Sequence, residues 1–262
     1  MPPLPPLLLP DNTLDWEVLF QVYEFAQFQT FADELTRSEI SFVEQVLGLT
    51  DAGSVLDVAC GAGRHALELG RRGYSVEGIE VNPTLVEYAA TCAYEDATRV
   101  RFVAGDMREL SYPAQFDAAL VMNSSLGFFD DATNRRVLKA CAESLVQGGR
   151  LLLQCINPYH IESYLAGFRS GWYALAGGYV LREASFDPLR ASLNIAYRFV
   201  SPKGGIDVQH PGDQIRLYGY PELIAMLADV GMRPLMVFGD AVLPIVLFEE
   251  ASQWQVLVAE RL

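Results

Sequence analysis

The chain has few basic residues for its length. Its 262 residues include 19 Lys and Arg against 33 Asp and Glu, which gives a formal net charge of −14 at pH 7. No run of adjacent basic residues is longer than a pair such as Arg71-Arg72. An acidic surface repels the phosphate backbone of DNA and RNA. We therefore expect no nucleic-acid partner.

Long apolar stretches are also missing. No run in the sequence approaches the roughly 20 apolar residues that a membrane-spanning helix needs. The first ten residues are largely apolar, but they include five prolines and no basic residue, which is not the pattern of a secretion signal. The sequence predicts a cytoplasmic protein with no membrane partner.

Residues that commonly bind metals are scarce. The four cysteines (Cys60, Cys92, Cys141 and Cys155) have no spacing typical of a metal site, and there are only three histidines. Each cysteine lies in a predicted core element, which favours buried, reduced thiols. We expect no metal ion.

The most informative stretch covers residues 55–65 and reads Val-Leu-Asp-Val-Ala-Cys-Gly-Ala-Gly-Arg-His. The apolar run over 54–58 predicts a buried strand, and the pattern after Gly63 predicts a helix over 64–72. Gly61 and Gly63 allow the backbone between them to approach a ligand closely, and free N–H groups at the start of the helix favour an anionic or electron-rich partner. Asp57, at the end of the buried strand, is expected to brace this glycine turn.

A glycine turn of this kind also occurs in nicotinamide-binding proteins, so the strands that follow must decide between the alternatives. A strand over 75–79 leads to Glu80, whose carboxylate can accept both ribose hydroxyls of an adenosine. A third strand, over 101–104, is followed by Asp106, which can accept from an adenine amino group. An acid at this third position is not part of the nicotinamide pattern. A fourth strand, over 118–122, leads into Asn123.

This combination resembles the class I S-adenosylmethionine-dependent methyltransferases, and more narrowly those that act on small molecules in bacteria. Four motifs match in order, over residues 56–63, 78–80, 105–107 and 116–123, and Arg216-Leu-Tyr218 matches a further motif of that group. The chain departs from the group's pattern in the segment that begins at Asn123, where an aromatic residue and Ser-Phe-Gly-Tyr are more common. The resemblance implies S-adenosylmethionine as cofactor and metal-independent transfer of its methyl group to N or O of a small molecule by direct displacement.

The resemblance also implies roles for individual residues. The backbone of the glycine turn would contact the methionine part of the cofactor, Glu80 its ribose, Asp106 and the Met107 N–H its adenine, and Asn123 its ammonium group. The full set of implied cofactor contacts is Tyr23, Asp57, Ala59, Gly61, Gly63, Glu80, Val81, Asp106, Met107 and Asn123.

Three residues are candidates for catalysis or for contact with the acceptor. His65 begins the helix after the glycine turn, at the mouth of the implied site. Arg216 and Tyr218 lie on a predicted strand that can face the acceptor. The alternatives are an ordinary satisfied histidine and a packing pair between strands.

The order of predicted elements indicates an α/β fold. Strands and helices alternate over residues 51–156, which predicts a Rossmann-like parallel sheet with its ligand at the carboxyl ends of the strands. Residues 157–218 predict a small antiparallel insert, with strands over 179–186, 192–200 and 206–217, that either caps the acceptor or joins a homodimer. Residues 219–262 are expected to complete a seven-stranded sheet with a reversed last strand. Residues 1–50 form an arm and helical segment, which the resemblance implies to be a lid.

Two other functions stay open at this point. The same glycine turn would serve a nicotinamide-dependent oxidoreductase, and a protein that binds the cofactor without turning it over would carry the same motifs. The identity of the acceptor does not follow from these motifs, because the variable insert rather than the cofactor loops would select it.

Overall fold

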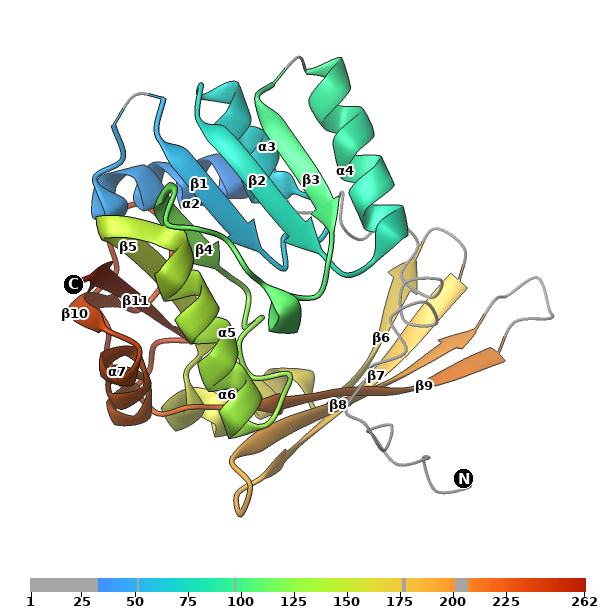
Figure 1. The fold of residues 1–262 in the computed structure, drawn as a ribbon. Helices are drawn as coiled ribbons and strands as arrows, with labels where there is room; N and C mark the ends of the chain where they lie inside the picture. The colour runs from blue at the N-terminus through green and yellow to red at the C-terminus, as the bar shows by residue number, and fades with distance from the viewer. Residues whose placement is uncertain (1–32, 51, 97, 176–177, 201–206) are drawn as a thin grey trace.

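A computed structural model describes residues 33–50, 52–96, 98–175, 178–200 and 207–262. The strands form a seven-stranded sheet and a separate four-stranded sheet. Figure 1 shows the smaller sheet on the side of the molecule toward which β1, β2 and β3 point.

The large sheet has the predicted Rossmann-like arrangement. Its strand order is β10-β11-β5-β4-β1-β2-β3, and β11 runs antiparallel to both of its neighbours, β5 and β10, while the other pairs are parallel. The prediction of seven strands with a reversed last strand is therefore confirmed. The strand bounds are β1 Ser54–Val58, β2 Ser75–Glu80, β3 Val100–Ala104, β4 Phe116–Val121, β5 Leu145–Ile156, β10 Met232–Phe238 and β11 Trp254–Arg261.

Helices cover both faces of this sheet (Figure 1). On one face α2 (Asp33–Leu47) and α3 (Arg64–Arg71) share a core with Val55 of β1, and α4 (Pro83–Glu95) lies beside α3. On the other face α5 (Asp131–Ser144) and α7 (Tyr220–Asp229) share a core with Leu56. Successive residues of β1 thus serve opposite faces, because side chains alternate along a strand.

Helix α2 is part of the core in the region that the structure describes. Its side chains Ile40, Phe42 and Val43 are fully buried and share a core with residues of the sheet. The lid predicted for residues 1–50 falls mostly on residues 1–32, which lie outside the described residues, as does Tyr23.

The insert contains one strand more than the sequence predicts. The four antiparallel strands are β6 Ser170–Leu175, β7 Gly178–Asp187, β8 Ser192–Val200 and β9 Asp207–Arg216. They follow helix α6 (Ile161–Phe168), and this helix, Ile156 at the end of β5 and the sheet share a small core. The sequence of β6 has no clear alternation, and its pairing with β7 defines it as a strand.

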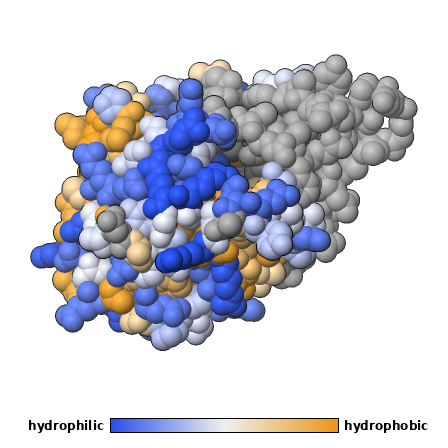
Figure 2. All heavy atoms as spheres, turned by 90° about the horizontal axis from the view of Figure 1, so that it is seen from above, coloured by the Kyte–Doolittle hydropathy of each residue, from blue (hydrophilic) through white to orange (hydrophobic). Residues whose placement is uncertain are grey.

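Figure 2 views the molecule from the side of the amino ends of β1, β2 and β3, where hydrophilic side chains cover the middle of the described surface. Of the helices in the described residues, none has the length and apolar character needed to cross a bilayer. The same part of the chain holds no group of three or more His, Cys, Asp or Glu arranged to bind a metal ion.

Candidate functional site

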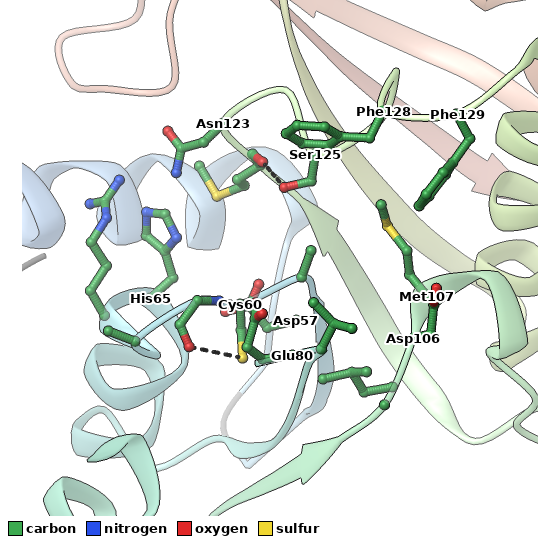
Figure 3. Close-up of a pocket in the computed structure, with 18 of the residues that line it drawn as sticks. Asp57, Cys60, His65, Glu80, Asp106, Met107, Asn123, Ser125, Phe128 and Phe129 are labelled. Atoms are coloured by element: carbon green, nitrogen blue, oxygen red, sulfur yellow. Dashed lines mark hydrogen bonds between the residues drawn. The ribbon is translucent and has the colours of Figure 1, made fainter. Parts of the chain in front are cut away.

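A cavity of about 450 Å³ lies at the carboxyl ends of β1, β2, β3 and β4. This is where open α/β sheets bind their ligands. Figure 3 shows the predicted residues converging on it from separate strand ends. The predicted residues that line the cavity are Asp57, Ala59, Gly61, His65, Glu80, Val81, Asp106, Met107 and Asn123.

The glycine turn between β1 and α3 has an unusual backbone. Ala59, Gly61 and Gly63 all have positive φ values, of 56°, 57° and 80°. A Cβ atom at Gly63 would lie 2.5 Å from the Phe102 ring on β3, so a side chain is excluded there. A Cβ atom at Gly61 would meet nothing within 4 Å, so this position opens into the cavity. The turn therefore leaves room for a ligand against its backbone.

Glu80 is buried at the end of β2 and is fixed by two backbone groups. Its Oε2 accepts a hydrogen bond from Gly61 N at 2.9 Å, and its Oε1 accepts one from Asn82 N at 2.9 Å. Burial raises the pKa of this carboxyl, and the two amides partly offset that rise. Since each carboxylate oxygen can accept a second hydrogen bond, Glu80 can still bind a pair of hydroxyl groups.

Asp57 has a carboxylate oxygen without a partner. Its side chain is buried, and among the described residues nothing donates a hydrogen bond to Oδ2. Burial raises its pKa to about 7, although the Arg64 charge and a hydrogen bond from the Ala66 amide act in the opposite direction. The bracing of the glycine turn by Asp57 stays a prediction. The unpartnered oxygen beside the cavity fits a cationic ligand.

Asp106 follows β3 and caps the 3₁₀ helix η2 (Met107–Glu109). Its Oδ1 accepts from Arg108 N, and its Oδ2 accepts from Arg108 Nε, both at 2.8 Å. Burial raises the pKa of Asp106, but the hydrogen bonds and charge of Arg108 outweigh it and hold the pKa below its ordinary value. The Arg108 guanidinium also lies 4.9 Å from the centre of the Phe129 ring. The carboxylate therefore stays ionised at neutral pH, in a position fixed by Arg108.

His65 is buried in the cavity wall and contacts α2. Its Nε2 lies 3.1 Å from Oε2 of Glu39, and Glu39 also pairs with Arg64, whose Nη2 donates to Oε1 at 3.0 Å. Burial lowers the pKa of His65, with the Glu39 hydrogen bond acting against it, so the imidazole is neutral at pH 7. The structure thus places His65 at the cavity, with one ring nitrogen engaged by Glu39.

The loop after β4 forms the remaining wall. Asn123 and Ser124 have positive φ values of 54° and 59°, and such strain in non-glycine residues is frequent at functional sites. Asn123 N donates to Oε1 of Gln154 at 3.0 Å, which holds the loop on β5. Phe128 and Phe129, farther along the loop, line the cavity.

Arg216 and Tyr218 do not line the cavity. Tyr218 is buried, and its hydroxyl donates to Oδ1 of Asp131 at 2.8 Å. Arg216 pairs with Glu222 at 2.6 Å, and its guanidinium lies 4.5 Å from the centre of the Tyr218 ring. The two side chains thus contact each other outside the cavity lining, although Tyr218 lies beyond the end of β9, and the acceptor-facing role stays a prediction. Gly63 also lies outside the lining residues and acts through the shape of the turn.

Several lining residues are absent from the sequence-based set. Phe128 belongs to the unusual segment after Asn123, so that departure from the family pattern was the available signal. Trp254 at the start of β11 carries no local signal, because the sheet topology alone brings it to the cavity. The additional lining residues are Cys60, Ala62, Arg64, Ile79, Gly105, Met122, Ser125, Phe128, Phe129 and Trp254.

The chain is similar in sequence to known methyltransferases. Residues 55–149 match the family model described as "Methyltransferase domain". A putative methyltransferase of Geobacillus sp. strain WCH70 is 27% identical over 126 residues, which cover 47% of this chain and 51% of that protein. The chain therefore matches about half the length of this relative. A dTDP-4-amino-2,3,4,6-tetradeoxy-D-glucose N,N-dimethyltransferase of Saccharopolyspora spinosa is 28% identical over 191 residues, which cover 71% of this chain and 73% of that protein.

Solved structures share the fold over nearly the whole chain. A S-adenosylmethionine-dependent methyltransferase of Clostridium acetobutylicum superposes with a TM-score of 0.75 at 15% identity, covering 94% of this chain and 98% of that one. The sugar N-methyltransferase KedS8 of Streptoalloteichus sp. superposes with a TM-score of 0.69 at 21% identity, covering 91% of this chain and 92% of that one. These matches confirm the predicted fold and give no support to the nicotinamide-dependent alternative.

Proposed function

We propose that this chain, whose residues 55–149 match the model of a methyltransferase domain, transfers a methyl group from S-adenosylmethionine to N or O of a small molecule. The observation that carries the proposal is the set of three acids at the ends of β1, β2 and β3 around one glycine turn (Asp57, Glu80 and Asp106).

The three acids differ in a way that suits one ligand. Glu80 keeps acceptor capacity for the two ribose hydroxyls, and Asp106 is ionised and can accept from the adenine amino group beside Met107. The unpartnered Oδ2 of Asp57 would face positive charge on the methionine part. We propose that Asn123 and the backbone of Ala59 and Gly61 complete this end of the site.

When bound, S-adenosylmethionine supplies an activated methyl group on a sulfonium. The protein's part is to hold the acceptor in line with that methyl group, and such positioning can supply much of the rate. Phe128, Met122 and Trp254 are apolar residues of the cavity lining and would exclude water from the acceptor. An acceptor that must lose a proton needs a base, and neutral His65 is our candidate for that role.

The nature of the acceptor and the setting of the protein are further parts of the proposal. The strongly acidic composition favours a free small molecule over nucleic acid. All four cysteines are free thiols, which suits the cytoplasm. The second sheet would either cap the acceptor or join two chains in a homodimer, and gel filtration with light scattering distinguishes these roles.

Methyl transfer can be tested with isotopically labelled S-adenosylmethionine and a panel of amines, phenols, carboxylates and sugars, read by mass spectrometry. We expect a labelled product and S-adenosylhomocysteine from the wild type, and neither from Gly61→Arg, whose side chain would project into the cavity. Cofactor binding without turnover on any acceptor would instead indicate a non-catalytic cofactor-binding protein.

A further inference from the structure

Asn134 lies in the first half of α5, outside the cavity, and no part of its side chain reaches solvent. We propose that it is a positioning residue, which sets the place of the aromatic wall formed by Phe128 and Phe129. The inference rests on the proposed function, because the wall matters only if the cavity holds a ligand.

The side chain of Asn134 is bonded at both ends of its amide. Its Oδ1 accepts a hydrogen bond from Gly127 N at 3.3 Å. Its Nδ2 donates to the Phe129 carbonyl at 2.7 Å and to the Tyr218 hydroxyl at 2.9 Å. Both amide hydrogens are thus in use, together with one acceptor site on the oxygen. Aspartate lacks the donors and leucine lacks both functions, so the position requires an amide.

These hydrogen bonds anchor the loop at Gly127 and at Phe129, the residues on either side of Phe128. Gly127 has a φ value of 119°, and a Cβ atom there would lie 2.5 Å from the Arg216 carbonyl oxygen. Its own carbonyl accepts from Arg216 N at 2.8 Å. The loop is therefore pressed between α5 and the end of β9 with no free space at Gly127. A small shift of either anchored backbone group would move the two rings that face the cavity.

The same hydrogen bonds connect Arg216 and Tyr218, which lie outside the cavity, to the loop that lines it. Tyr218 accepts from Asn134 and donates to Asp131, while the Arg216 backbone holds Gly127. The insert that ends with β9 is thereby linked through Asn134 to the cavity wall. A shift of β9 can therefore move the loop that lines the cavity.

The competing explanation is that Asn134 only stabilises the fold. Ser144 provides a matched control, since it lies on the same helix and is equally buried, and its hydroxyl donates to the Cys141 carbonyl at 2.7 Å. Loss of its hydroxyl removes a buried hydrogen bond without touching the loop. A purely structural role for Asn134 predicts that both variants lose stability and that neither changes binding by the folded protein.

The test uses S-adenosylhomocysteine and calorimetry on the full chain, with the folded fraction measured by circular dichroism. We expect Asn134→Leu to weaken binding at least fivefold and Ser144→Ala to change it less than twofold, because two backbone groups of the loop lose their partner only in the first variant. Equal affinity of wild type and Asn134→Leu would overturn the inference. Failure of the wild type to bind would instead overturn the proposed function.

Asn134→Asp keeps the test decisive if the leucine variant does not fold. A protonated carboxyl has the shape of the amide and regains one donor, so we expect binding by this variant to recover as the pH falls, relative to the wild type at each pH. Weak binding that stays constant with pH relative to the wild type, or binding equal to the wild type throughout, would contradict the positioning role.

Discussion

The backbone amide of Gly61 donates a hydrogen bond to Oε2 of Glu80 over 2.9 Å. This contact joins the glycine turn after β1 to the acid at the end of β2. Glu80 is therefore part of the structure of the turn as well as a candidate ligand for the ribose. Changes at either residue are expected to affect stability and binding together.

Glu80→Gln is expected to weaken S-adenosylhomocysteine binding by about tenfold to a hundredfold, which corresponds to roughly 1–3 kcal/mol for an impaired buried hydrogen-bond acceptor. Isothermal titration calorimetry measures this. Glu77→Gln is the control, because Glu77 lies on the same strand but pairs with Arg101 at 3.1 Å and does not line the cavity. An equal loss in both variants would show that Glu80 has no specific role.

Gly63→Ala should destabilise the protein more than Gly73→Ala. Both glycines have positive φ values, of 80° and 96°, so each alanine has a backbone cost of about 1–2 kcal/mol. Only at Gly63 does the new Cβ atom also meet the Phe102 ring, at 2.5 Å, and such overpacking adds about 1–3 kcal/mol. Urea unfolding at constant m-value gives the difference, and equal losses would argue against the close contact with β3.

Asp57 should make both stability and cofactor binding depend on pH. Burial raises its folded-state pKa to about 7, above the ordinary value of 3.8. The raised pKa means that protonated Asp57 adds to the free energy of unfolding. This contribution is fully present below pH 3.8 and is lost as the pH rises toward 7. Asp57→Asn should remove this part of the pH dependence of the unfolding free energy. Unfolding measured for both proteins between about pH 4 and pH 7 gives the difference.

Binding of a cationic cofactor should have the opposite dependence on pH. Positive charge beside Asp57 favours its ionised form, so affinity for S-adenosylmethionine is expected to rise through pH 7 with release of a proton. Titrations in two buffers of different ionisation enthalpy measure the proton release. Release that persists unchanged in Asp57→Asn would assign it to another group.

Glu39→Gln should weaken the contact between α2 and the start of α3. Its carboxylate pairs with Arg64 and contacts His65, and both partners are largely buried, so we expect a loss of about 2–4 kcal/mol in unfolding free energy. Asp96→Asn is the comparison, since its pair with Arg71 is partly exposed and should contribute less than about 1 kcal/mol. Similar losses in the two variants would mean that α2 is held by apolar packing alone.

The sequence predicted the features of this fold that depend on local pattern. Alternating strands and helices, the glycine turn and the acids after three strands are short-range signals, and the parallel sheet brings their ends to one edge. Glu80 and Asp106 could be placed in this way before any coordinates. The reversed β11 came from the resemblance to the family.

Features that depend on distant partners could not be predicted. Strand β6 is defined by its pairing with β7, and Trp254 reaches the cavity only through the position of β11 in the sheet. Arg216 and Tyr218 match a family motif, yet neither lines the cavity, and Arg216 contacts the loop after β4 from outside the lining residues. Asn134 is an unremarkable helix residue in the sequence, and its role follows only from three contacts in space.

Calorimetric titration of the wild-type chain with S-adenosylhomocysteine tests the central claim most directly. We predict saturable one-to-one binding that Gly61→Arg abolishes, and no heat on titration with NADH. The absence of binding by the wild type, or binding that Gly61→Arg leaves unchanged, would contradict the assignment of this cavity to an adenosyl cofactor.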